Sequence, residues 1–163
     1  MPGKVTKTNV ARLLDKAKIN YELISYPVDE SDLSAQHIAE TVGEDINKVF
    51  KTIVLKGDRN GHFICVVPGN CEVDLKLAAK ASGNKKADLI LMKELLPLTG
   101  YIRGGCSPIG LKKPFPIFYH SSITLYDKIY VSAGQRGTQL LIAPSELIAY
   151  TNGTITDLVD NSK

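Results

Sequence analysis

No stretch of this chain is apolar for long enough to cross a membrane, and its cysteines form no C-x-x-C pair. The longest apolar runs, such as Phe63–Val67, fall far short of the roughly 20 residues that a membrane-spanning helix needs. The three cysteines, Cys65, Cys71 and Cys106, are odd in number, and no histidine stands near them at a zinc-ligand spacing. We therefore expect reduced thiols, no bound metal and no association with a membrane.

Two further absences limit the chemistry and the location. The chain has neither a Walker A motif nor a G-x-G-x-x-G motif after a strand, so the sequence predicts no nucleotide cofactor. Residues 1–4 lead directly into polar sequence without the apolar stretch of a signal peptide, which favours a cytoplasmic protein. The excess of 20 basic over 17 acidic residues is too small for a general nucleic-acid coat. It permits a partner whose phosphates bind at one local patch.

Composition and hydrophobic periodicity predict one domain of mixed α+β structure. With 163 residues, 44% of them apolar, and no repeat or linker, the chain suits a single domain over 1–163. Helices are expected at 10–17, 35–42, 74–82 and 144–150, with a helical turn at 93–96. Strands are expected at 21–26, 49–56, 62–67, 87–91, 101–103, 115–119, 128–132 and 139–142. This order favours a mixed, mostly antiparallel, barrel-like sheet surrounded by helices.

Lys51 is the most informative single residue, because it lies in an expected strand with two largely apolar faces. Side chains alternate between the faces of a strand, and a lysine in a covered strand must lose its hydration or find an anion. The alternative interpretation is a lysine at the start of the strand whose ammonium group reaches water. The pattern by itself leaves both interpretations open.

Two segments rich in small residues could bind an anion or a carbonyl. Segment 100–110 contains four glycines, which let backbone N–H groups approach a ligand closely and converge on it. Its alternative interpretation is a bulge and a bend in a curved sheet. Segment 132–137 follows a strand and carries Arg136, which could bind a phosphate. Its alternative is an ordinary hairpin turn with a solvated arginine.

Other residues indicate a chemical role less strongly. Cys106 and Ser107 could be nucleophiles, but no histidine lies near them in the sequence to act as a base. Tyr26 could stack on a nucleobase, although tyrosines in strands more often belong to the core. The lysine pairs at 85–86 and 112–113 could bind RNA phosphates, or they could form an ordinary solvated surface.

Three of these segments are specific when they occur in one order, although each is weak alone. They are Phe50-Lys51-Thr52, then Gly100-Tyr101 with Gly104-Gly105-Cys106-Ser107-Pro108-Ile109-Gly110, then Tyr130-Val131-Ser132-Ala133-Gly134-Gln135-Arg136-Gly137. In this order they resemble the YbaK family of Cys-tRNA(Pro) deacylases, free-standing relatives of the editing domain of bacterial prolyl-tRNA synthetases. The resemblance covers nearly the whole chain. It implies a barrel-like sheet surrounded by helices, and release of a wrongly attached amino acid from a tRNA 3′ end.

The resemblance also assigns substrate-binding residues. Lys51 matches the family's essential lysine, which would anchor the terminal adenosine phosphate or the ester region by its charge. Thr52 follows it as in the family, and Tyr26 stands where the family has a tyrosine near the pocket. Ser132 and Gly134 match the small-residue motif beside the substrate.

The glycine loop carries the catalytic role that the resemblance implies. Gly104 and Gly105, with Ser107 and Pro108, match the loop that holds the ester end of the substrate. Backbone N–H groups there would polarise the ester carbonyl. In this family the thiol of the substrate cysteine is thought to attack its own carbonyl, so that the tRNA leaves and a cyclic thiolactone forms. Such a reaction depends on orientation and needs no enzyme nucleophile, metal or cofactor.

The implied partners are the 3′ end of tRNA(Pro) and, in a transient complex, prolyl-tRNA synthetase. Cys-tRNA(Cys) is a further candidate substrate. Two other functions stay open at this point. One is a deacylase for another small amino acid such as alanine, which would use an activated water. The other is a non-catalytic module that binds tRNA or the synthetase.

The chain departs from the family pattern at two places. Segment 32–36 is one residue shorter, and Leu33-Ser34 stands where an aromatic residue often lies. Gln139 stands where an aspartate can occur, and we assign it no catalytic role. Both departures concern the shape of the amino-acid pocket.

Overall fold

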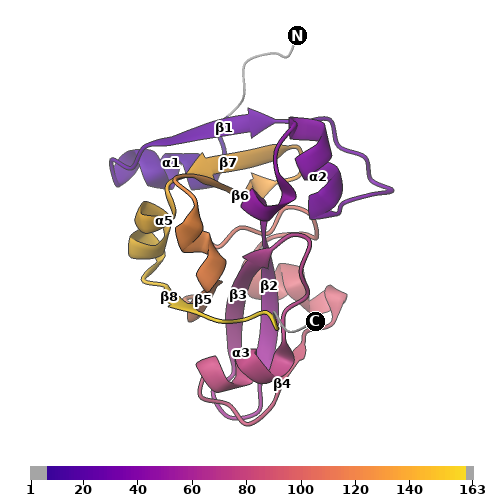
Figure 1. Ribbon diagram of the computed structural model, residues 1–163, viewed down its shortest axis with the longest axis vertical. Helices are drawn as coiled ribbons and strands as arrows, with labels where there is room; N and C mark the ends of the chain where they lie inside the picture. Colours follow the sequence, from indigo (N-terminus) through magenta and orange to yellow (C-terminus); the bar gives the residue numbers. More distant parts are fainter. Residues whose placement is uncertain (1–6, 161–163) are drawn as a thin grey trace.

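Two β-sheets form the framework of the computed structural model, which describes residues 7–160 (Figure 1). The three-stranded sheet has the order β1–β7–β6, formed by Tyr21–Ser25, Thr138–Ile142 and Ile129–Gln135. The five-stranded sheet has the order β4–β2–β3–β5–β8, formed by Ala87–Leu89, Phe50–Gly57, His62–Pro68, Ile117–His120 and Thr154–Thr156. Residues 1–4, on which the expectation about secretion depends, lie outside the described residues.

The strand pairing confirms a mixed, mostly antiparallel α+β fold. Every pair in the three-stranded sheet is antiparallel, as are β2–β3 and β2–β4. Only β3–β5 and β5–β8 are parallel. The two sheets meet where β2 begins, through an isolated parallel bridge between Val49 and Tyr130. The barrel-like sheet is therefore made of two sheets joined at one place.

Five short helices flank the sheets. They are α1 (Asn9–Lys16), α2 (Ala35–Val42), α3 (Leu75–Ala81), α4 (Leu95–Thr99) and α5 (Pro144–Thr151). The Ser34 hydroxyl accepts the His37 N–H at 3.1 Å, and Gly43 ends α2 with a left-handed φ of 73°. Three 3-10 turns complete the elements, at Ile46–Lys48, Met92–Glu94 and Ser121–Leu125. None of the described helices is long and apolar enough to span a membrane.

The core explains why β2 and β3 are apolar on both faces. One cluster fills the space between the two sheets and includes Val54 and Ile64 with Leu140 of β7. A second cluster lies under α3 and includes Leu55 and Phe63. Full burial of such side chains stabilises the fold by about 1.5–3 kcal/mol each. Position 51 therefore belongs to a strand that is covered on both sides.

The strand expected at 101–103 is wrong, because this segment is a loop. Gly100 ends α4 with φ of 82°, and the Gly105 N–H donates to the Ile102 carbonyl at 2.9 Å. The chain therefore turns back on itself where a strand would have to continue outward. The short strand β8 was not predicted, because its residues are largely exposed and its parallel partner, β5, is far away in the sequence.

Candidate functional site

A cavity of about 520 Å³ opens at an unpaired edge of β2. β4 pairs with β2 over Leu55–Gly57 and the Ile90 N–H donates to the Val54 carbonyl at 3.4 Å, so the edge formed by residues 51–53 borders the cavity instead of another strand. The remaining walls come from the start of α2, the 103–106 loop, the segment after β4, and the facing strands β6 and β7. A volume of this size is typical of small-molecule sites.

Lys51 lies in the wall of this cavity. Its side chain both reaches water and lies near an anion, so each of the two interpretations of the sequence holds in part. Its side chain is 26% exposed, and its Nζ lies 3.7 Å from the Glu72 carboxylate. Glu72 itself is 95% exposed and is held by no other ion pair among residues 7–160. An anionic group of a ligand can therefore replace this carboxylate beside Lys51 at little cost. The neighbouring Thr52 also lines the cavity, and its Oγ1 is buried without a hydrogen-bond partner in the described chain.

Ser132 and Gln139 lie directly opposite each other in the β6–β7 pair and form the facing wall. The Ser132 hydroxyl accepts the Gly134 N–H at 3.1 Å. Gln139 is only 2% exposed, yet its Oε1 has no partner among residues 7–160. From the sequence, Gln139 was a departure from the family pattern without a catalytic role. Its unpaired oxygen became visible only in the fold.

The glycine loop lies with its backbone against the β6–β7 turn. A Cβ atom on Gly105 would stand 3.1 Å from the Gln135 Cα and 3.2 Å from the Arg136 N, so only glycine permits this approach. The Arg136 Nε donates to the Arg103 carbonyl at 2.8 Å. Arg136 therefore holds the loop in place, whether or not it also contacts a phosphate. Gly104, with φ of 86°, lines the cavity.

The hydrogen bonds of this loop decide which backbone N–H groups can reach a substrate carbonyl. The Gly105 N–H is already used by the Ile102 carbonyl, so it supports the loop and is not free to donate to a substrate, contrary to expectation. Arg103, Gly104 and Cys106 are the cavity-lining residues of the loop, and none of their N–H groups donates a hydrogen bond within the described chain. The backbone donors that are free beside the cavity therefore flank Gly105.

Four other candidates are not in the wall of this cavity. Ser107 and Pro108 are buried, and the Ser107 Oγ accepts the Ile109 N–H at 3.2 Å, which makes them a support under the loop. Tyr26 packs in a small cluster with α2. Gly134 borders a separate hollow of about 290 Å³. The structure therefore gathers Lys51, Thr52, Gly104 and Ser132, and leaves these four around them.

The cavity contains a thiol but no partner that would activate it. Burial raises the pKa of Cys106 to about 12, so the thiol stays protonated at neutral pH. His120 lies in β5, outside the cavity wall, and its Nδ1 accepts the Leu158 N–H at 3.0 Å. Cys65, Cys71 and Cys106 are all free thiols. Within residues 7–160 no cluster of three potential ligands could hold a metal ion.

Comparison with protein families gives a match over most of the chain. The model described as "Aminoacyl-tRNA editing domain" matches residues 30–150. A protein of Enterococcus faecalis (strain ATCC 700802 / V583), named "Putative Cys-tRNA(Pro)/Cys-tRNA(Cys) deacylase EbsC", is 44% identical over 152 residues, which are 93% of either chain. A segment of the proline–tRNA ligase of Fervidobacterium nodosum is 29% identical over 79 residues, which are 48% of this chain and 14% of the ligase.

Solved structures show the same fold at lower identity. One is described as "Crystal structure of a putative trans-editing enzyme for prolyl tRNA synthetase". It is 24% identical, superposes with a TM-score of 0.82, and is matched over 96% of this chain and 100% of its own. The two-sheet arrangement is thus shared beyond the range of clear sequence similarity.

Proposed function

The chain belongs to the aminoacyl-tRNA editing domain family, and on this premise we propose that it is an enzyme that deacylates Cys-tRNA(Pro) and Cys-tRNA(Cys). The observation that carries the proposal is the cavity itself. It joins Lys51, Gly104 and Ser132, which come from three distant segments, around a space large enough for an amino-acid ester. The name of the Enterococcus relative supports the choice of cysteine.

Lys51 and the glycine loop would hold the two ends of the ester group. The Lys51 ammonium binds a phosphate or the ester region of the terminal adenosine and takes the place of its contact with Glu72. The Gly104 and Cys106 N–H groups polarise the ester carbonyl. Backbone donors fixed by Arg136 and by the close approach of Gly105 need no reorganisation as negative charge develops on the carbonyl oxygen.

The unpartnered acceptors in the wall suit the amino-acid end of the substrate. A cysteine ester offers hydrogen-bond donors, namely its ammonium group and its thiol. The Thr52 Oγ1 and Gln139 Oε1 are buried acceptors without a partner in the described residues. A ligand that donates to them recovers the cost of burying them, which is about 1–3 kcal/mol for each group.

The reaction then needs orientation instead of an enzyme nucleophile. The substrate sulfur attacks the carbonyl carbon, a carbon–sulfur bond forms, and the bond from that carbon to the ribose oxygen breaks. The thiol proton passes to the ribose oxygen, which leaves free tRNA and a cyclic thiolactone. The protonated state of Cys106 is consistent with this route.

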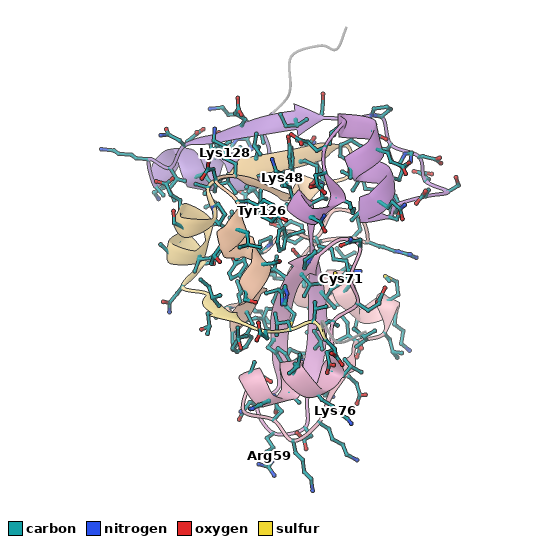
Figure 2. The ribbon with its side chains drawn as sticks, viewed as in Figure 1. Lys48, Arg59, Cys71, Lys76, Tyr126 and Lys128 are labelled. Carbon is teal, nitrogen blue, oxygen red and sulfur yellow. The ribbon has the colours of Figure 1, made fainter. Side chains whose placement is uncertain are left out.

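Deacylation of tRNA(Pro) charged with cysteine or with alanine tests the proposal. For the Lys51→Ala variant we expect kcat/KM on the cysteine ester to fall by about 100-fold or more, with an unchanged unfolding midpoint. Lys128→Ala, an exposed lysine on another part of the surface (Figure 2), is the matched control and keeps full activity. Faster release of alanine would indicate a water-using deacylase. Binding of tRNA without any release would indicate a non-catalytic module.

We also propose that the protein acts in the cytoplasm and meets its tRNA in a transient complex with prolyl-tRNA synthetase. The similarity to a segment of a proline–tRNA ligase supports this partner. Sedimentation of the protein with the synthetase, with and without tRNA(Pro), tests it. Co-sedimentation only in the presence of tRNA is the expected result.

A further inference from the structure

Six cationic side chains gather at one end of the long axis of the molecule, away from α1 and β1 (Figure 1). They come from the end of β2, from the β2–β3 turn, from α3 and from the loop before β4, and all are exposed. We call this group the basic end: Lys56, Arg59, Lys76, Lys80, Lys85 and Lys86. Figure 2 shows Arg59 and Lys76 projecting outward there. None of the six forms a salt bridge with residues 7–160.

The carboxylates nearby are mostly committed to backbone N–H groups. The Asp58 carboxylate accepts the Lys85 and Lys86 N–H groups at 3.0 and 3.1 Å. The Asp74 carboxylate caps α3 and accepts the Lys76 N–H at 2.9 Å. Asp88 is exposed opposite Lys56 in the strand register. These three carboxylates keep their charge and offset three of the six cations, so a positive excess of three is left.

The basic end is also rigidly built, although it is a turn and a loop. The Asn84 Oδ1 accepts the Arg59 and Asn60 N–H groups at 2.9 and 2.8 Å. The Asn60 side chain donates back to the Ser82 carbonyl at 3.0 Å. These contacts tie the β2–β3 turn to the loop after α3, so the backbone that carries these cations is preformed. A preformed backbone loses less entropy on binding than a mobile one.

The basic end is continuous with the cavity. β4 runs from Ala87 to Leu89, directly after Lys86, and Leu89 lines the cavity. At about 3.3 Å per residue, Lys86 is about 10 Å along the strand from the cavity wall. A ligand that fills the cavity and continues along β4 therefore reaches the basic end without crossing another element.

We propose that the basic end binds the phosphates of the tRNA acceptor arm while the 3′ end of the same tRNA occupies the cavity. This inference rests on the proposed function, because it takes an aminoacyl-tRNA as the ligand. The substrate of an editing domain is an RNA, so a substrate bound in the cavity extends a polyanion toward the basic end. Each lysine–phosphate contact then releases counterions. The contacts are to backbone phosphates, so they position the tRNA and carry no sequence preference.

A double variant, Lys85→Gln with Lys86→Gln, tests the proposal on two substrates. One is full-length Cys-tRNA(Pro), and the other is adenosine esterified with cysteine, which carries no phosphate for the basic end to bind. On the tRNA we expect kcat/KM to fall about tenfold at low salt, and the slope of its logarithm against that of salt concentration to shrink by about 2. The variant should deacylate the adenosine ester at the rate of the unchanged protein, which also shows that the variant is folded.

Arg12→Gln with Lys16→Gln is the matched control, because it removes the same charge from exposed positions on α1. Equal rates and salt slopes for the two double variants on tRNA would overturn the basic-end proposal. If the unchanged protein releases cysteine from neither substrate, the proposed function fails instead. Fluorescence anisotropy with uncharged tRNA then still decides the inference. Weaker binding by the Lys85→Gln, Lys86→Gln variant than by the control supports it, and equal binding overturns it.

Discussion

Two buried side-chain amides, Asn84 near the basic end and Gln139 in the cavity wall, differ in how their oxygens are paired. Asn84 is 8% exposed, its oxygen accepts two backbone N–H groups, and its nitrogen donates to the Ser82 hydroxyl at 2.8 Å. Gln139 is 2% exposed, and its oxygen has no partner in the described chain. A buried polar atom without a partner costs about 1–3 kcal/mol. The paired amide therefore supports the scaffold, and under the proposed function the unpaired one accepts a hydrogen bond from the substrate.

Two glycines, one in the β2–β3 turn and one in the loop beside the cavity, also differ in what they do for the structure. Gly61 ends the β2–β3 turn with φ of 75°, and a Cβ atom there would meet nothing within 4 Å. Gly105 is needed because a Cβ atom would press on the backbone of the β6–β7 turn. One glycine serves a local backbone conformation, and the other serves contact between distant segments.

The largest effect is expected from Gly105→Ala. Its Cβ would meet backbone atoms at 3.1–3.2 Å, so the loop and the β6–β7 turn must separate by a few tenths of an ångström. Since a misplacement of about 1 Å costs about 100-fold in rate, we expect this shift to lower kcat/KM by about 10- to 100-fold. Gly61→Ala is the control: it should cost about 1–2 kcal/mol of stability through its left-handed φ and leave activity unchanged. Deacylation rates and urea unfolding of both variants check this, and an active Gly105→Ala protein would contradict the assigned role of the loop.

An intermediate effect is expected from replacing each amide by an apolar side chain of similar shape. Asn84→Leu leaves two backbone donors without their acceptor and should lower the free energy of unfolding by about 2 kcal/mol, while the cysteinyl ester of adenosine is still deacylated at the normal rate. Gln139→Met removes an unpaired acceptor, so stability should hold or rise while kcat/KM falls about tenfold, the loss of one hydrogen bond to a charged group. Equal losses of stability in the two variants would show that Gln139 is structural.

The smallest effect concerns His120, a buried and paired group outside the cavity. Burial lowers its pKa in the folded protein, with an opposing effect from Asp157. Below the unfolded value of about 6.5, the unfolded chain binds a proton that the folded chain does not, so stability falls as pH drops until the folded pKa is passed. His120→Asn keeps an acceptor for the Leu158 N–H and should lose this dependence. Thermal unfolding between neutral and mildly acidic pH checks this, and parallel curves for the two proteins would refute it.

The helices and the central hairpin could be predicted from the sequence because their signals are local. Ser34 and Gly43 delimit α2 by hydrogen bonds and φ angles within a few residues. The strand expected at 101–103 failed for the opposite reason. Residues 101–103 have the composition of a strand, but they lie between glycines with positive φ that turn the chain, and they pair with no strand of the described chain.

The site was predicted in part. Lys51, Thr52, Gly104 and Ser132 were expected together and line one cavity. Gly105 lies in the loop as expected, but its N–H donates to the Ile102 carbonyl within that loop. Gln139 was noted but given no role, because a glutamine in a strand has no local signal that separates a paired amide from an unpaired one.

By itself the sequence determined the family, the local elements and the chemical groups available: one lysine in an apolar strand, a glycine-rich loop and cysteines without a base beside them. The tertiary structure alone decided which of these groups meet and which polar atoms are left without partners. The physical reason is that hydrogen-bond satisfaction is set by atoms from distant segments. The Asn84 oxygen accepts two backbone N–H groups of the β2–β3 turn. The wall around Gln139 offers the oxygen of that side chain no donor within the described chain.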